Sequence, residues 1–91
     1  MSVRIRIPAP LRSVTDGVAE FSFDGASVSQ VLTQLETQFP AIRQRLRDDE
    51  GAIRRFVNLY VNGEDVRFLQ GLDTGLKAGD EVSIIPAVAG G

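Results

Sequence analysis

One amphipathic helical segment between two groups of alternating segments limits the fold of this chain more than any other feature. Ser27 is followed three residues later by Gln30, which fits a capping box, in which each side chain accepts a hydrogen bond from an amide at the helix start. Pro40 ends the helix or starts another turn, because it lacks an amide donor and restricts the residue before it. The apolar positions recur at the spacing of one buried helical face, with polar residues opposite: Val28, Val31, Leu32, Leu35 and Phe39 against Gln30, Thr33, Gln34 and Glu36.

Alternating apolar and polar residues before this helix predict two β-strands. Val3, Ile5 and Ile7 alternate with arginines, and Phe21 and Phe23 alternate with polar residues. Proline residues and an Asp-Gly turn signal separate the two segments. We therefore expect the two strands to form a hairpin.

The second half of the chain returns to the strand pattern after a short, second helical piece around Ile42 and Leu46. Alternation from Phe56 to Val61 predicts a third strand, which Asn62-Gly63 ends in a tight turn. Residues 66–68 are the predicted short partner strand, and residues 82–85 form the last strand before Pro86. A helix that crosses between two such units covers one face of a mixed sheet, so the sequence predicts the α+β class with a β-grasp architecture.

The order of elements shows no repeat and no internal boundary, so we expect a single domain over residues 1–91 with a flexible tail over residues 86–91.

A mixed charge run bounded by Gly51 is typical of a solvated face and loop. No apolar run near the start is long enough for a signal peptide or a membrane span, so we expect a cytoplasmic protein. The run consists of Arg43, Arg45, Arg47, Asp48, Asp49 and Glu50.

The composition excludes most kinds of catalytic site. Net charge is −2 with a pI near 5.0, which disfavours nucleic acid as a partner. The chain has neither histidine nor cysteine, so it cannot build a Ser-His-Asp triad, a Cys-His pair or a histidine or thiolate metal centre. It also carries no phosphate-binding glycine motif. The acidic residues fall in predicted loops without an apolar pocket to raise a pKa: Asp48, Asp49, Glu50, Glu64, Asp65, Asp73 and Asp80. We therefore expect no bound cofactor and no metal, and a chain that serves as the substrate of partner enzymes.

The last six residues, Pro86-Ala87-Val88-Ala89-Gly90-Gly91, remain as the candidate site. Six extended residues reach at most about 20 Å, and glycines without a Cβ can enter a narrow channel. A carboxylate is a poor electrophile, whereas an acyl adenylate carries a good leaving group that sulfur can displace. ATP and the sulfur-donating thiol must come from another protein, because this chain has no nucleotide motif and no cysteine.

Three segments, PLRSVTDG, RFVNLYVNGEDVRF and LKAGDEVSIIPAVAGG, resemble the MoaD/ThiS sulfur-carrier family, whose members are similar to ubiquitin in fold and end in Gly-Gly. The resemblance implies that an enzyme similar to ubiquitin-activating (E1) enzymes adenylates the carboxylate of Gly91 and that sulfur then replaces the adenylate. Gly90 would supply the slim, flexible approach. We expect Ala87, Val88 and Ala89 to contact partner enzymes.

The stretch VNLYVNGEDVRF looks closest to the carriers that serve cysteine synthesis. In those systems a pyridoxal-phosphate-dependent synthase takes the sulfur and a metalloprotease trims the adduct. The charged stretch from Arg47 to Arg55 departs from the molybdopterin branch, which leaves the small subunit of molybdopterin synthase as an alternative. A modifier joined to lysine amines is a second alternative, because both outcomes share the adenylate.

A docking surface is expected on the sheet face away from the helix. The period of two places six residues there, of which Tyr60 and Ile85 are the partner-binding candidates. Phe68 and Leu69, beside a turn, are similar candidates. If the chain were only a binding module, its function would depend on this surface and survive loss of the tail. The six residues are Arg4, Arg6, Asn58, Tyr60, Ser83 and Ile85.

Overall fold

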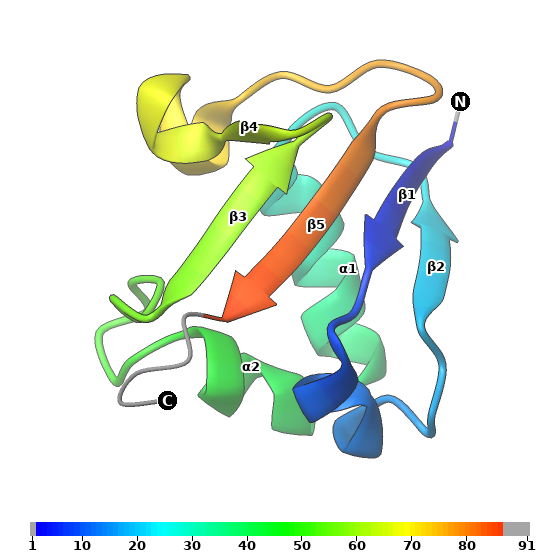
Figure 1. Ribbon diagram of the computed structural model, residues 1–91, viewed down its shortest axis with the longest axis vertical. Coiled ribbons are helices and arrows are strands. Elements are labelled where there is room, and N and C mark those ends of the chain that lie inside the picture. The colour runs from blue at the N-terminus through cyan, green and yellow to red at the C-terminus, as the bar shows by residue number, and fades with distance from the viewer. Residues whose placement is uncertain (1, 87–91) are drawn as a thin grey trace.

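The computed structural model describes residues 2–86 and has a five-stranded mixed sheet. The strand order is β2-β1-β5-β3-β4, and β1 and β5 are parallel while the other neighbours are antiparallel. Both α-helices lie on one face of this sheet (Figure 1). This is the predicted β-grasp arrangement. The strands are β1 (Val3–Arg6), β2 (Glu20–Phe23), β3 (Val57–Val61), β4 (Glu64–Asp65) and β5 (Glu81–Pro86); the helices are α1 (Val28–Gln38), α2 (Pro40–Leu46) and the 3-10 helices η1 (Ala9–Val14), η2 (Val66–Phe68) and η3 (Gly71–Asp73).

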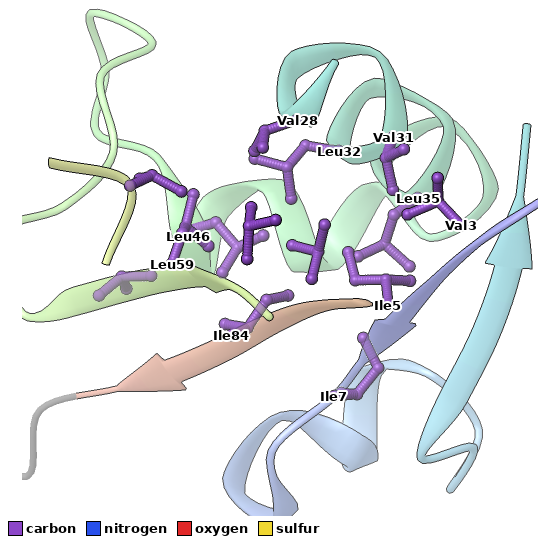
Figure 2. Close-up of a cluster of buried hydrophobic side chains, with 14 of the residues drawn as sticks. Val3, Ile5, Ile7, Val28, Val31, Leu32, Leu35, Leu46, Leu59 and Ile84 are labelled. Carbon is purple, nitrogen blue, oxygen red and sulfur yellow. The ribbon is translucent and has the colours of Figure 1, made fainter. Parts of the chain in front are cut away.

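The apolar face of α1 lies on the sheet and forms the core with it. Leu32 and Leu35 of α1 are completely buried, and so is Ile5 of β1. Figure 2 shows these side chains converging between the helix and the strands, together with Leu46 of α2 and Ile84 of β5. The predicted apolar face of the helix therefore packs against the predicted apolar face of the strands. The strands contribute every second residue to the core, and the helix contributes residues spaced three or four apart.

The start of α1 differs from the predicted capping box in one hydrogen bond. The Ser27 hydroxyl accepts from the backbone amide of Gln30 at 3.2 Å, as expected. The Gln30 side chain accepts from the amide of Ala26 at 2.8 Å rather than from that of Ser27. Both side chains still satisfy amides at the helix start, so the local signal that begins the helix is the predicted one.

The short partner strand predicted at residues 66–68 is wrong. Asn62 and Gly63 both have positive φ, at 51° and 88°, and form a two-residue turn that pairs Val61 with Glu64 at once. The partner strand is therefore Glu64–Asp65. The carboxylate of Asp65 then accepts from the amide of Arg67 at 2.9 Å, which begins η2 in place of a longer strand.

The last strand is one residue longer at each end than predicted, and Pro86 is its final residue. Pro86 lies opposite Val57 of β3. Asn62, one position beyond this register, donates its amide to the carbonyl of Glu81 at 2.9 Å, and hydrogen-bonded pairs alternate from there, so Val57 and Pro86 form a non-hydrogen-bonded pair. The missing amide of Pro86 therefore breaks no hydrogen bond to β3, and the proline is tolerated at the strand end.

Candidate functional site

The candidate site begins where β5 ends. β5 lies between β1 and β3, and its last residue, Pro86, is paired with Val57 of β3, so the chain leaves the sheet from a fixed position. In Figure 1 β5 ends close to helix α2. The predicted reactive residues Gly90 and Gly91, and the predicted contacts Ala87, Val88 and Ala89, lie outside the described residues.

An open cavity of about 490 Å³ borders Pro86. Its apolar part includes Phe56, whose side chain is 47% exposed. Arg45 and Arg54 supply positive charge, and Arg54 is held in place because its Nε donates to the carbonyl of Gln44 at 2.9 Å. An apolar hollow with guanidinium groups at its rim suits an apolar side chain flanked by carboxylates. The lining residues are Pro10, Leu11, Gln44, Arg45, Arg54, Phe56, Val57 and Pro86.

The sheet face away from the helices brings together two of the four predicted docking side chains, Tyr60 and Ile85. Tyr60 lies opposite Ser83, and Ile85 lies opposite Asn58, so both belong to the outward face of β3 and β5. Ile85 is 46% exposed. Phe68 does not belong to this group, because it lies on η2 beyond the edge strand β4, where it is 85% exposed.

The same outward face carries a small ion network. The guanidinium groups of Arg4 and Arg6 lie 3.5 and 3.9 Å from the carboxylate of Glu81, the first residue of β5. Both arginine side chains are more than half exposed, so water screens these pairs and they add little stability. Their arrangement does keep two cations on the surface that carries Tyr60 and Ile85.

Two of the carboxylates that the sequence placed in loops are buried and have structural roles. The carboxylate of Asp80 accepts from the side-chain amide of Asn62 at 3.0 Å and from the backbone amide of Lys77 at 2.9 Å, and these bonds lower its pKa. Asp65 forms a two-pronged pair with the guanidinium of Arg67, with contacts of 2.7 to 3.2 Å, which lowers its pKa. Both groups hold their charge firmly, so neither is suited to act as a general acid.

Sequence reasoning missed the partner of Glu36. Glu36 lies on the face of α1 predicted to be polar, opposite the apolar face, yet it is buried. Its carboxylate accepts from Nε of Arg47 at 2.6 Å. Arg47 belongs to the charge run predicted to be solvated, so this part of the prediction is wrong for that residue. The signal available was weak, because an acid and a base eleven residues apart in sequence have no fixed spacing in space.

A second open cavity, of about 650 Å³, was not predicted. It lies between the loop before β3, β3 itself and the segment from η2 to η3. Its walls are largely apolar, with arginines at the loop and at η2. They are formed by Ala52, Ile53, Arg54, Arg55, Val57, Asn58, Leu59, Val66, Arg67, Gly71 and Leu72.

The described part of the chain contains no group of three or more histidine, cysteine, aspartate or glutamate side chains placed to hold a metal ion. Between residues 2 and 86, no helix has the length and apolar character needed to cross a membrane.

Comparison with known proteins identifies the family of this chain. The model of the ThiS family matches residues 5–91. The sulfur carrier protein CysO of Mycobacterium tuberculosis is 46% identical over 93 residues, which cover 100% of both chains. Small archaeal modifier protein 3 of Haloferax volcanii is 43% identical over 68 residues, or 75% of this chain and 73% of the relative.

Solved structures agree with the sequence matches. A chain in the crystal structure of the Amycolatopsis orientalis BexX/CysO complex superposes with a TM-score of 0.89 at 43% identity, and the match covers 98% of this chain and 99% of that one. The predicted β-grasp fold and the predicted resemblance to sulfur carriers are both confirmed. The chain belongs to the ThiS family.

Proposed function

We propose that this chain is a sulfur carrier protein in which the carboxylate of Gly91 is the working group. An E1-like enzyme uses ATP to adenylate this carboxylate, and a sulfur nucleophile then displaces the adenylate to leave a thiocarboxylate. The observation that carries the proposal is the match to the ThiS family, which runs through Gly90 and Gly91 to the last residue. The full-length identity to a sulfur carrier protein supports it.

The architecture is consistent with this role. β5 fixes the position of Pro86, and the five following residues can extend at most about 18 Å from it. Adenylation and sulfur transfer therefore take place on a partner enzyme that receives these residues, while the folded body docks on that partner. We assign the docking to the outward sheet face at Tyr60 and Ile85, with Phe68 as a separate contact.

Cysteine synthesis is the favoured destination of the sulfur, because the sulfur carrier protein CysO matches this chain over its whole length at 46% identity. In this proposal a pyridoxal-phosphate-dependent synthase accepts the sulfur and a metalloprotease trims the adduct. The large subunit of molybdopterin synthase is the alternative acceptor. The chain itself holds no cofactor and acts as a protein cosubstrate. Since activation consumes ATP, we place the process in the cytoplasm.

Intact-mass spectrometry tests the carrier chemistry. The protein is incubated with ATP, a candidate E1-like enzyme and a sulfur source, and an exchange of one oxygen for sulfur is expected at Gly91. A variant that lacks Gly91 should stay unmodified, whereas Val18→Ala, an exposed position between η1 and β2 that keeps the tail, should still be converted. Sulfur transfer that continues without Gly91 would refute the proposal.

Protein modification is the second candidate function, favoured by the relative named small archaeal modifier protein 3. A modifier would use the same adenylate but would transfer Gly91 to lysine amines of target proteins. Isopeptide-linked products that disappear when Gly91 is deleted would support it. Formation of the thiocarboxylate without such products would leave the carrier function alone.

A further inference from the structure

The basic residues of this chain are almost all arginine. Of ten, nine are arginines and one, Lys77, is a lysine. A lysine amine can attack an activated acyl group once it is deprotonated, whereas a guanidinium stays protonated and does not. Cysteine and histidine are absent, so the chain has no thiolate and no imidazole to activate a hydroxyl group. Lys77 is therefore the one side-chain amine that an activated glycine could acylate.

Lys77 is exposed on the rigid turn that precedes β5. Its backbone amide donates to the carboxylate of Asp80 at 2.9 Å, and its carbonyl accepts from the amide of Asp80 at 3.0 Å. The turn is also tied to the start of the chain, because Gly79 donates its amide to the carbonyl of Ser2 at 2.9 Å. Within residues 2–86, the Lys77 amine forms no ion pair with a carboxylate. The side chain is thus presented to solvent from a fixed base.

The two ends of β5 separate Lys77 from the start of the tail. Figure 1 shows β5 crossing the sheet from the turn that carries Lys77 to Pro86. Six residues of strand, Glu81–Pro86, place their first and last Cα atoms about 17 Å apart. A tail that turned back along the strand would use about two of its five residues in the reversal and would retain a reach of roughly 10 Å. This reach ends short of the first residue of β5, and Lys77 lies four residues before that strand, so we infer that the tail does not reach Lys77 of its own chain.

The cations close to the start of the tail are arginines. Arg45 and Arg54 line the same cavity as Pro86, well within the reach of the five following residues. A lysine at either position would place an amine beside the activated glycine. The chain thus carries positive charge there without a nucleophile, and keeps its single amine at the other end of β5.

We propose that Lys77 is the single side-chain acceptor of this chain for an activated glycine C-terminus, and that its position restricts the reaction to the tail of a second copy. The proposal rests on the activation of Gly91 described above. In the step, the neutral Lys77 amine attacks the carbonyl carbon of Gly91 in the acyl adenylate. A C–N bond forms, the C–O bond to AMP breaks, AMP leaves with the bonding electrons, and the amine proton passes to water.

A chemically activated chain tests this without the adenylating enzyme. The full chain is prepared by intein cleavage as a Gly91 thioester and incubated at mildly alkaline pH, where lysine amines are partly deprotonated. Mass spectrometry and peptide mapping should show dimers and larger products that are branched at Lys77. Lys77→Arg keeps the charge and should lose the branched products. Two results would overturn the proposal. One is a wild-type monomer in which Gly91 is joined to Lys77 of the same chain, and the other is more linkage at the α-amine of the first residue than at Lys77.

A second variant tests the role of reach. In R45K/K77R the only lysine lies at the rim of the cavity beside Pro86, and we expect a cyclic monomer lighter by one water than the hydrolysed chain. Dimers without the cyclic monomer would overturn the argument from distance. Because the thioester supplies the activation, these outcomes do not depend on an adenylating enzyme. Failure of the E1-like enzyme to adenylate the wild-type chain with ATP would instead refute the proposed function alone.

Discussion

Nε of Arg47 donates a hydrogen bond to the Glu36 carboxylate at 2.6 Å, and the two side chains are only 13% and 9% exposed. The same guanidinium donates through Nη1 to the carbonyl of Gly51 at 3.1 Å. Arg47 therefore links the loop between α2 and β3 to helix α1. That loop continues to Arg54 and Phe56, which line the cavity beside Pro86.

Replacing Arg47 with methionine should destabilise the fold strongly. R47M leaves the Glu36 carboxylate nearly buried without its cation, and removal of one partner of such a pair costs about 3 kcal/mol. Urea denaturation of R47M and wild type measures the difference in the free energy of unfolding. Arg43→Met, which removes an exposed arginine from the same charge run, is the control and should change stability little.

The double variant E36L/R47M separates a charge penalty from lost packing. It replaces both ions with apolar groups, which is often close to neutral for a buried pair, so it should recover most of the stability that R47M loses. If the double variant is as unstable as R47M, the pair acts through its geometry, namely the hydrogen bond to Gly51, and not through the charge left uncompensated.

Asp80 should make stability depend on acid pH. Its carboxylate accepts hydrogen bonds from the Asn62 side chain and from the backbone amide of Lys77, and these two bonds lower its pKa below the ordinary value of 3.8. The unfolded chain therefore binds a proton at higher pH than the folded chain. The stabilisation is fully present above the ordinary pKa and is lost as the pH falls through the lower pKa of the folded state.

Asp80→Asn tests this dependence. The variant should be less stable than wild type at neutral pH, because it lacks the charge that accepts both hydrogen bonds. Its free energy of unfolding should also fall less steeply than that of wild type as the pH drops below 3.8. Asp73→Asn, at an exposed carboxylate, is the matched control. Equal slopes for wild type and D80N would contradict the assignment.

The signals that predicted the fold are local in sequence. Ser27 begins α1 through a hydrogen bond three residues away, and the Asn62-Gly63 pair fixes the turn after β3 through its own backbone angles. The alternation of inward and outward positions along the last strand predicted that Ile85 faces outward, and the structure has Ile84 buried and Ile85 exposed. Such features depend on residues within a few positions of one another, so a single sequence contains them.

The features that were missed depend on contacts between distant segments. Apolar residues 66 and 68 favoured a strand, but the turn at Asn62-Gly63 set the pairing two residues earlier and Asp65 began η2. The Glu36–Arg47 pair joins α1 to a loop, and the cavity beside Pro86 needs residues from η1, α2 and β3 at once. Neither has a period or spacing that the sequence displays. The reactive residue was instead predicted by resemblance and by chemistry.

Removing the Ser27 hydroxyl should weaken the start of α1. Ser27→Ala loses the acceptor for the Gln30 amide, which costs about 1 kcal/mol at a helix N-cap. Thermal or urea denaturation measures the loss. Ser29→Ala, two residues later and inside the helix, is the control, because alanine there improves helix propensity slightly. A destabilisation in S29A equal to that in S27A would show that the cap contributes nothing.

An acidic residue at Ile85 should impair docking without unfolding the protein. Ile85 is 46% exposed on the outward face of β5, so Ile85→Asp leaves the core beneath intact. A buried aliphatic anchor in an interface contributes about 1–2 kcal/mol, and its loss should raise KM for adenylation by the E1-like enzyme roughly tenfold or more, with kcat nearly unchanged.

Two variants show whether the outward face or η2 is the contact. Val18→Asp places the same charge at another exposed apolar residue, between η1 and β2, and should leave KM unchanged. Phe68→Ala tests the separate aromatic on η2. If KM rises for F68A and not for I85D, the partner docks at η2, and the outward sheet face is an ordinary solvated surface. Increases in both variants would place the two surfaces under one partner.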